Sequence, residues 1–489
     1  MHRPGRGTGS LKTVTLRLYD TGARELREFI PLVPGKVGIY LCGPTVQSAP
    51  HIGHLRSAIA FDVLVRWLQR SGYQTTVIRN VTDIDDKILN KSAEAGRPWW
   101  AWAMRFEREF NAAYQALGVL SPDYEPRATG HVPQMIALME QLVERGHAYT
   151  AGEGNVYFDV NSFPQYGALT NQRLEDLHSS EEDFPGKRNP HDFALWKAPK
   201  AGEPTSASWE TPYGVGRPGW HLECSAMART YLGSQFDIHG GGLDLRFPHH
   251  ENEQAQSRAA GDAFANYWLH HGWVTQGGVK MSKSLGNGLL ASVLLEQVPP
   301  VILRYALTAV QFRSTLEWGE STVTESKAIW DRFSGFADRA AAKVGEVSAA
   351  EVAEVSLPDA FTAAMNDDLN VPAAIAVIHE AVRLGNGALS DGDLVTARQH
   401  LVQLRAMLWV LGLDPHSAQW HSASGGEKYE SALDELVAAQ IKQRQEARAA
   451  KDYQRADDIR QSLEAAGIAL ADSAQGTTWS IVTEESEQE

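Results

Sequence analysis

Cysteine is scarce in this sequence, and the scarcity limits what the protein can be. Cys42 and Cys224 are the only two cysteines among 489 residues. Two thiols cannot build the disulfide framework of a small secreted domain, and unpaired thiols suit a reducing cytosol. Basic charge is also in deficit, because the formal net charge is −15. That net charge argues against a protein that binds polyanions non-specifically. It is compatible with a local basic surface for one nucleic-acid partner.

Long apolar runs are missing as well. No stretch approaches the roughly 20 residues that cross a bilayer, and the longest candidate, residues 289–303, is interrupted by Glu296 and by Pro299-Pro300. Residues 1–12 lack the apolar core of a secretory signal, so we expect a flexible, slightly basic tail there. These absences predict a cytoplasmic protein. A length of 489 residues with 43% hydrophobic content predicts two to four globular domains.

An α/β pattern opens the chain. Residues 37–41 are typical of a buried strand, and residues 75–79 are typical of the next one. Between them, a helix is expected to run from Pro50, at its first position, to about residue 71. A strand, a helix and a second strand in succession predict a parallel sheet. Strand character resumes at residues 235–239, just before three glycines at 240–242.

Later segments change character. Residues 120–220 are rich in proline, glycine and aromatic residues without clear periodicity, which indicates an insertion. Residues 320–415 are helical in pattern and rich in alanine and leucine. Residues 422–427 (Ser-Ala-Ser-Gly-Gly-Glu) are an expected linker. A small final unit follows at 428–482, and residues 483–489 form an acidic tail.

Two short motifs are suited to phosphate. His51 and His54 lie three residues apart at a helix start, where unpaired N–H groups and the helix dipole favour an anion. Gly53 leaves room for a ligand near the backbone. Lys280 and Lys283 lie in a glycine-flanked Lys-Met-Ser-Lys-Ser stretch that can reach phosphates. The alternatives are a pair of surface histidines that cap a helix, and an exposed basic loop.

A metal site is one interpretation of the cysteines. His249 and Glu253 are four residues apart, so on a helix they share a face and can bind one metal. Cys42 and Cys224 are far apart in the sequence, and on chemistry alone a small buried apolar role is favoured for each. The carboxylates of residues 80–87 (Asn-Val-Thr-Asp-Ile-Asp-Asp-Lys) suggest either magnesium or a helix cap with a solvated acidic turn.

Together these motifs resemble the class I aminoacyl-tRNA synthetases. His51-Ile52-Gly53-His54 and the 280–284 stretch match the two nucleotide-binding motifs of that class, in the same order. Within the class, the chain looks like the cysteinyl-tRNA synthetase family over residues 13–482. The stretches that carry this resemblance are residues 40–46, 219–227, 236–244, 247–257, 450–453 and 475–479.

The resemblance implies an α/β fold: a Rossmann-type parallel-sheet catalytic domain with an insertion, followed by an α-helical bundle and a small C-terminal anticodon-binding domain. We expect the catalytic domain at residues 13–119 and 221–290, interrupted by the connective insertion at 120–220. A stem-contact region is expected at 291–325, the tRNA-binding bundle at 326–420 and the anticodon-binding domain at 428–482.

The resemblance also implies how the reaction is divided among residues. One zinc would be held by Cys42, Cys224, His249 and Glu253, and would bind the thiol of L-cysteine so that serine is rejected. Tyr40, Thr82 and Trp220 would line the cysteine pocket. ATP with Mg²⁺ would lie over Gly43 and the helix start, with Asp244 near the ribose. The groups that would stabilise charge during adenylate formation are His51, His54, Lys280 and Lys283.

The C-terminal unit would read tRNA-Cys. Arg444, Arg448, Lys451 and Arg455 have the spacing of a basic helical stripe, whose alternative is an ordinary solvated helix. The resemblance places anticodon contacts in this unit, with Arg448, Tyr453, Asp457, Arg460 and Asp472 as candidates.

Two rival functions deserve comparison with a monomeric cysteinyl-tRNA synthetase. One is the related ligase that joins cysteine to an amino-sugar inositol in mycothiol synthesis, against which the extension over residues 330–482 argues. The other is a catalytically inactive RNA-binding paralogue. The intact His51, His54, Lys280 and Lys283 argue against that second possibility.

Overall fold

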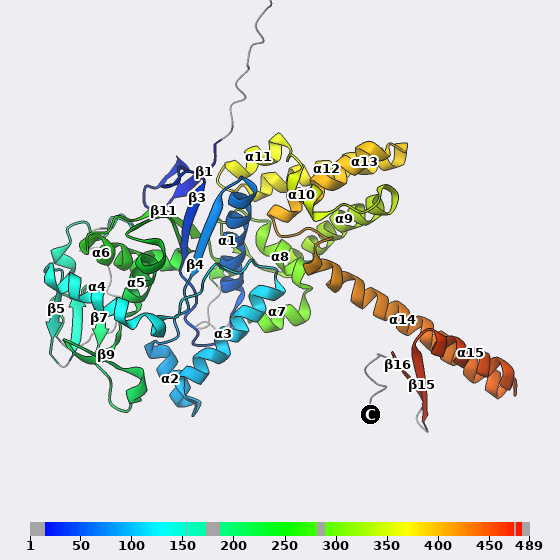
Figure 1. Cartoon of the computed structure of the whole chain (residues 1–489), viewed down its shortest axis with the longest axis horizontal. Coiled ribbons are helices and arrows are strands. Elements are labelled where there is room, and N and C mark those ends of the chain that lie inside the picture. Colours follow the sequence, from blue (N-terminus) through cyan, green and yellow to red (C-terminus); the bar gives the residue numbers. More distant parts are fainter. Residues whose placement is uncertain (1–14, 153, 173–185, 281–288, 474–475, 482–489) are drawn as a thin grey trace, which may run out of the picture. The chain divides into compact units, whose positions relative to one another are not determined.

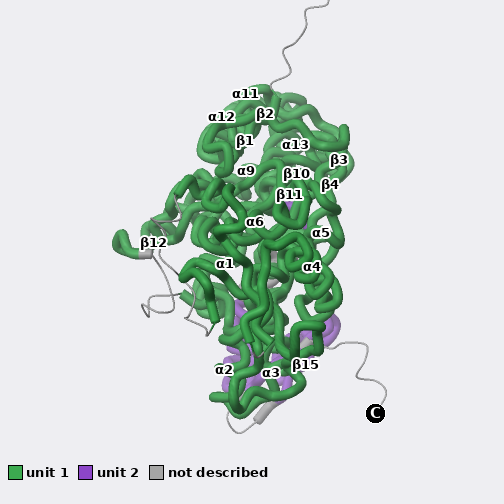
Figure 2. The backbone as a smooth tube through the Cα atoms, turned by 90° about the vertical axis from the view of Figure 1, so that its left-hand side faces the viewer, with its two compact units in different colours: residues 1–415 green, residues 416–489 purple. Residues whose placement is uncertain are grey.

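The chain folds into two compact units. In the computed structural model these are residues 1–415 and 416–489, shown in green and purple in Figure 2. The residues that the structure describes are 15–152, 154–172, 186–280, 289–473 and 476–481.

A four-stranded parallel sheet forms the centre of the first unit (Figure 1). Its strand order is β11-β10-β3-β4, and every neighbouring pair is parallel. The strands are β3 (Lys36–Leu41), β4 (Gln74–Arg79), β10 (Gln235–Gly242) and β11 (Phe264–His271). The predicted parallel sheet is therefore confirmed. β10 also takes in the three glycines expected after it, because Gly240, Gly241 and Gly242 all pair with β11.

Helix α1 (Ile52–Arg70) connects β3 to β4. Its buried residues are mostly apolar, which packs the helix against the sheet, but they also include the charged Arg56, Asp62 and Arg66. The helix starts later than predicted: Pro50 lies outside it, and His51 is the N-cap residue. The capping interactions of two histidines, described below, take the place expected for proline.

An antiparallel sheet interrupts the catalytic fold, as expected for an insertion. Its strand order is β5-β6-β7-β9-β8. The strands are β5 (Ala148–Ala151), β6 (Asn155–Phe158), β7 (Phe193–Lys197), β8 (Trp209–Thr211) and β9 (Gly214–Pro218). The helices before it are α2 (Asp86–Glu94), α3 (Trp99–Ala116) and α4 (Val132–Glu144), and those after it are α5 (Trp220–Leu232) and α6 (Glu251–Ala259).

The rest of the first unit is mainly helical. The helices are α7 (Ala291–Gln297), α8 (Pro300–Thr308), α9 (Glu320–Val344), α10 (Ala349–Glu354), α11 (Asp359–Asn366), α12 (Val371–Asp391) and α13 (Leu394–Val410). Short strands complete it: β1 (Arg17–Asp20), β2 (Glu25–Glu28), β12 (Val274–Gln276), β13 (Val279–Lys280) and β14 (Leu316–Glu317).

A buried arginine joins this helical region to the sheet domain. Arg304 on α8 pairs with Asp62 on α1, and both side chains are fully buried. The Arg304 Nε and Nη1 groups donate to the backbone oxygens of Leu411 and Leu117, each at 2.9 Å. The guanidinium therefore satisfies groups from three segments at once, which is what a buried charge requires.

The second unit consists of α14 (Ala418–Ala449), α15 (Tyr453–Ala465) and a hairpin of β15 (Ile468–Ser473) and β16 (Gly476–Ile481). The linker expected at residues 422–427 is wrong, because this stretch lies within α14. The single basic stripe is also wrong: α14 ends at Ala449, Lys451 follows in a turn with φ of 61°, and Arg444 is 2% exposed. Within the described residues, no helix combines the length and apolarity needed to cross a membrane.

Candidate active site and metal centre

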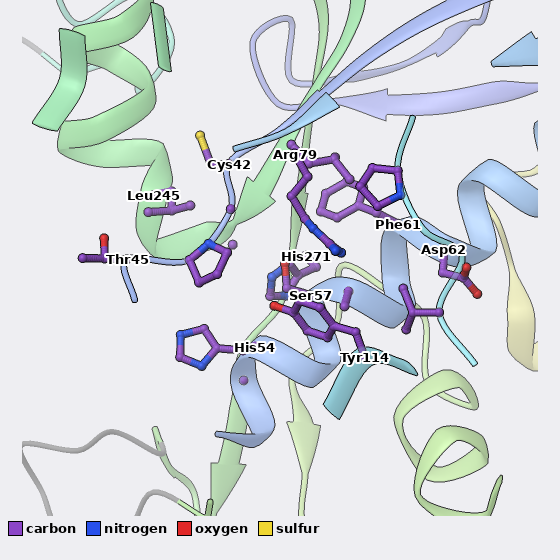
Figure 3. Close-up of a pocket in the computed structure, with 18 of the residues that line it drawn as sticks. Cys42, Thr45, His54, Ser57, Phe61, Asp62, Arg79, Tyr114, Leu245 and His271 are labelled. Carbon is purple, nitrogen blue, oxygen red and sulfur yellow. The ribbon is translucent and has the colours of Figure 1, made fainter. Parts of the chain in front are cut away.

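A cavity of about 330 Å³ opens at the carboxyl ends of the parallel strands, the usual ligand position of an open α/β sheet. Figure 3 shows its lining residues. The cavity brings together seven residues singled out from the sequence: Cys42, Gly43, His51, Gly53, His54, Trp220 and Asp244. They come from segments as far apart as β3, α1, α5 and the end of β10.

His51 and His54 form a reciprocal cap at the start of α1. The Gly53 N–H donates to His51 Nδ1 at 3.2 Å, and the His51 N–H donates to His54 Nδ1 at 3.1 Å. Their ring centroids are 3.8 Å apart. The capping interpretation is thus correct as local structure. It does not compete with a binding role, because both side chains also line the cavity.

The segment that follows the second phosphate motif is bonded to the start of α1. After it, Leu289 O accepts from Ile52 N at 3.0 Å, and Ala291 N donates to Pro50 O at 2.9 Å. Before it, β13 ends at Lys280. Lys283 and the rest of the stretch 281–288 lie outside the described residues, as does the side chain of Lys280. The segment after the motif, at Leu289 and Ala291, is therefore bonded to the start of α1.

Gly43 is required by a close backbone approach. A Cβ atom at this position would lie 1.6 Å from the Asn80 carbonyl oxygen. The Gly43 N–H also donates to Asn80 Oδ1 at 2.9 Å. Only glycine permits the loop after β3 to pack this tightly against the end of β4.

Next to the cavity, the two cysteines meet. Cys42 follows β3, Cys224 lies on α5, and their Sγ atoms are 3.7 Å apart. Glu253 Oε1 on α6 lies 3.3 Å from Cys42 Sγ and 3.0 Å from His249 Nε2. The ligand atoms of Cys42, Cys224, His249 and Glu253 all lie within 4.8 Å of one another. The structure thus assembles the four residues into one group able to hold a metal ion.

The electrostatics of this group favour a cation. Burial raises the pKa of the Cys42 thiol well above its ordinary range, and neighbouring Cys224 and Glu253 raise it further. Burial likewise raises the pKa of Cys224 to about 11. For His249, burial and then His221 and His239 lower the pKa well below its usual value, which leaves the imidazole neutral. Thiolates beside a carboxylate need a compensating positive charge, and a neutral imidazole is the form that binds metal.

Several buried histidines around the cluster were not singled out from the sequence. His239 Nε2 lies 2.8 Å from Glu253 Oε2, and His250 Nε2 lies 3.3 Å from Cys42 Sγ. Consequently Cys42, His239, His250 and Glu253 form a second potential ligand set. His221 Nδ1 contacts His249 Nδ1 at 2.9 Å. The available signal was the histidine density of residues 239–250, but spacing alone does not reveal which rings converge.

The three residues expected around the cysteine substrate take different positions. Trp220 lines the cavity, and its ring stacks on His249 with centroids 4.0 Å apart. Thr82 is 1% exposed and donates through Oγ1 to Glu223 Oε2 at 2.8 Å. Tyr40 is fully buried, and burial together with the neighbouring Cys224 and Cys42 raises the pKa of its hydroxyl well above the ordinary range. Only Trp220 among them is part of the cavity wall.

The acidic stretch after β4 supports the capping interpretation. Asp85 caps α2 by accepting from Lys87 N at 2.8 Å. Asp83 accepts from Thr129, and Asp86 accepts from Arg217 Nε at 3.0 Å. These carboxylates point to different partners and do not converge on one point.

In the second unit, Tyr453, Asp457 and Arg460 all lie exposed on α15. Tyr453 is 63% exposed, and Arg460 pairs with Glu464 at 2.8 Å. Arg448 lies in the last turn of α14, whereas the side chain of Asp472 lies outside the described part of the structure.

Comparison with known proteins connects these features. The family described as "tRNA synthetases class I (C) catalytic domain" matches residues 28–328, and the DALR domain matches residues 360–413. The cysteine–tRNA ligase of Beutenbergia cavernae is 60% identical over 96% of this chain and 99% of its own length. That of Streptomyces avermitilis is 54% identical over the same shares.

A solved structure shows a similar fold. Mycobacterium tuberculosis methionyl-tRNA synthetase in complex with methionyl-adenylate superposes with a TM-score of 0.56 over 78% of this chain and 90% of that one, at 16% identity.

Proposed function

The chain belongs to the class I cysteine–tRNA ligases, and we propose on that premise that it joins L-cysteine to tRNA-Cys in two steps at the cavity beside the metal centre. The first step consumes ATP and forms cysteinyl-adenylate and diphosphate. The second moves the cysteinyl group to the terminal adenosine of the tRNA. The observation that carries the proposal is the convergence of Cys42, Cys224, His249 and Glu253 next to the cavity at the start of α1.

In the activation step, the cysteine carboxylate attacks the α-phosphate of ATP. The carboxylate is already ionised, so the step needs no general base. Positioning and charge stabilisation remain the main tasks. His51 and His54 line the cavity for this purpose, and we assign Lys280, Lys283 and the Mg²⁺ that accompanies ATP to the phosphates. Gly43 and Asp244 also line the cavity, and we assign them to the nucleotide.

We further propose that the metal is zinc. Two thiolates bound tetrahedrally at about 2.3 Å would have sulfur atoms about 3.8 Å apart, and the two Sγ atoms lie 3.7 Å apart. Zinc, when bound, supplies a thiophilic Lewis acid that favours a thiol over a hydroxyl. Glu253 is oriented for such a site, because His239 Nε2 holds its Oε2 at 2.8 Å while Oε1 faces Cys42 and His249. Trp220 covers the His249 ring on the cavity side.

For the transfer step we place anticodon recognition on the second unit. Tyr453 offers an exposed ring for stacking, and Asp457 and Arg460 present an acceptor and a donor on the same helix. Arg448 and Asp472 remain further candidates. We expect the protein to act in the cytosol as a monomer.

A paired measurement tests the zinc site. Cys224→Ser should lose bound zinc and cysteine-dependent diphosphate exchange together, because a hydroxyl is a poor ligand for this metal. Met227→Leu, on the same helix and also fully buried, is the matched control and should keep both. Full exchange activity in a zinc-free Cys224→Ser protein would refute the assignment.

A second assay separates the proposed acceptor from the small-molecule one. The purified chain, given cysteine and ATP, is offered either tRNA or an amino-sugar inositol. Cysteinylation of tRNA alone is expected. Cysteinylation of the amino sugar without any charged tRNA would support the ligase of mycothiol synthesis as the function instead.

A further inference from the structure

Lys87 is a cation of the cavity wall that the activation step leaves unused. It lies in the first turn of α2, is exposed, and lines the cavity together with His51, His54 and Trp220. Among the lining residues that the structure describes, the other lysine or arginine is Arg79. That guanidinium is already neutralised, since Arg79 Nη2 lies 2.7 Å from Glu125 Oε1. Lys87 has no such partner in the part of the chain that the structure describes.

Lys87 has no ion-pair partner among the described residues although three carboxylates, Asp83, Asp85 and Asp86, lie within the four residues before it. Asp83 is bound to Thr129 N at 2.9 Å. Asp85 accepts the backbone N–H of Lys87 and not its ammonium. Asp86 is paired with Arg217, and its Oδ2 lies 3.2 Å from Lys197 Nζ. Each carboxylate is therefore occupied elsewhere, and the ammonium charge remains available to a ligand.

The first turn of α2 is also held firmly at the cavity. Lys91, one turn further, donates to Gln47 Oε1 at 3.0 Å, and Trp102 Nε1 donates to Gln47 O at 3.0 Å. Gln47 is itself part of the cavity lining. The Asp86 ion pairs fix the other side of the turn to the inserted sheet. Lys87 thus projects from an anchored element and does not depend on a loop for its position.

The topology separates Lys87 from the nucleotide. Asp244 follows β10 and residues 272–274 follow β11, whereas α2 follows β4 at the edge of the sheet opposite β11. Two strand spacings, about 10 Å, separate β4 from β10, and three, about 14 Å, separate β4 from β11. ATP placed over the start of α1 with its ribose near Asp244 would occupy the first side. The acceptor RNA has to enter from another direction, and its single-stranded end carries one phosphate per nucleotide.

We propose that Lys87 binds a backbone phosphate of the 3′-terminal nucleotides of tRNA and so positions the acceptor end for transfer. This role rests on the function proposed above. Lys87 is a positioning residue of the second step and does not touch the reacting atoms of the first. A long, exposed ammonium suits this task, because it follows a phosphate as a point charge without requiring fixed geometry.

The test compares two assays on the full-length protein. Lys87→Gln should raise the KM for tRNA about tenfold, the value of one charge-assisted hydrogen bond, while the KM for ATP in diphosphate exchange changes less than twofold. The dependence of log(kcat/KM) for tRNA on log[KCl] should become shallower by about 0.7, as expected for one lost contact with single-stranded phosphate. Lys87→Arg should restore most of the affinity.

Arg97→Gln provides the matched control. It removes an exposed positive charge ten positions along the chain that does not line the cavity, and it should leave both KM values unchanged. If Arg97→Gln raised the KM for tRNA as much as Lys87→Gln does, the effect would be a general electrostatic attraction of tRNA. If Lys87→Gln raised the KM for ATP as much as that for tRNA, Lys87 would be assigned to the nucleotide. Either result overturns the proposal. If the unaltered protein charges no tRNA, the proposed function fails and this role fails with it.

Discussion

Gly43→Ala is the sharpest single test of the catalytic geometry. The added Cβ would lie 1.6 Å from the Asn80 carbonyl oxygen and 2.7 Å from its carbon. Ordinary van der Waals contact begins near 3.4 Å. The loop after β3 therefore has to move by about 1.8 Å, the difference between that contact distance and 1.6 Å. The neighbours in this contact are backbone atoms, which cannot rotate away as a long side chain can.

That movement would displace both halves of the site at once. Cys42 precedes Gly43 and supplies one thiol of the metal group, while Gly43 itself lines the cavity. A misplacement of about 1 Å can cost about a hundredfold in rate. We therefore expect kcat/KM for cysteine-dependent diphosphate exchange to fall by at least about 100-fold, or about 2.7 kcal/mol of transition-state stabilisation. Zinc content should fall in the same preparation.

Gly387→Ala is the control for the same chemical change. Gly387 lies in α12, is exposed, and has nothing within 4 Å of an added Cβ. This variant should keep full exchange activity and gain about 0.5–1 kcal/mol of stability from a stiffer unfolded chain. Exchange above a tenth of the unaltered rate in Gly43→Ala would refute the close-approach argument.

Three further predictions concern other parts of the molecule. Arg304→Met should lower the free energy of unfolding by about 3–5 kcal/mol in urea titrations, because it removes one partner of the fully buried Asp62. Tyr453→Ala should raise the KM for tRNA about tenfold without affecting diphosphate exchange, if the exposed ring stacks on an anticodon base. Although burial acts in the opposite direction, the charges of Lys197 and Arg217 lower the pKa of Asp86 from its ordinary 3.8 to about 2. Its stabilising contribution is therefore full above about pH 4 and is lost as the pH falls through about 2, and Asp86→Asn should remove that part of the pH dependence in thermal melts between pH 5 and 2.

The sheet and its helix were predictable because local signals agreed. The apolar run at residues 37–41, the helical pattern after it and the next apolar run match β3, α1 and β4. The helix start shows the limit of such reasoning. Proline is favoured in a first turn in general, but here two histidine side chains cap the backbone and shift the start to Ile52.

Features that depend on tertiary contacts could not be read in advance. A Ser-Ala-Ser-Gly-Gly-Glu stretch has the composition of a linker, yet it continues α14. The intervals of four, three and four residues between Arg444, Arg448, Lys451 and Arg455 indicate one helical stripe only if the helix is unbroken. α14 ends two residues before Lys451. The buried histidines are a stronger case, since His239 reaches Glu253 and His250 reaches Cys42 only because β10 and the segment before α6 fold against the end of β3.

The position of Cys42 explains why one backbone segment can serve both amino-acid selection and activation. The Cys42 N–H donates to Gly240 O of β10 at 3.1 Å, so the residue belongs to the sheet. Its side chain points to Cys224 and Glu253, while the following Gly43 turns the backbone along the cavity. Under the proposed function, a substrate held through its thiol at this group would lie within one residue of the bound nucleotide. Selection of the thiol and placement of the carboxylate would then both depend on Cys42 and Gly43, so a change at either residue should alter both.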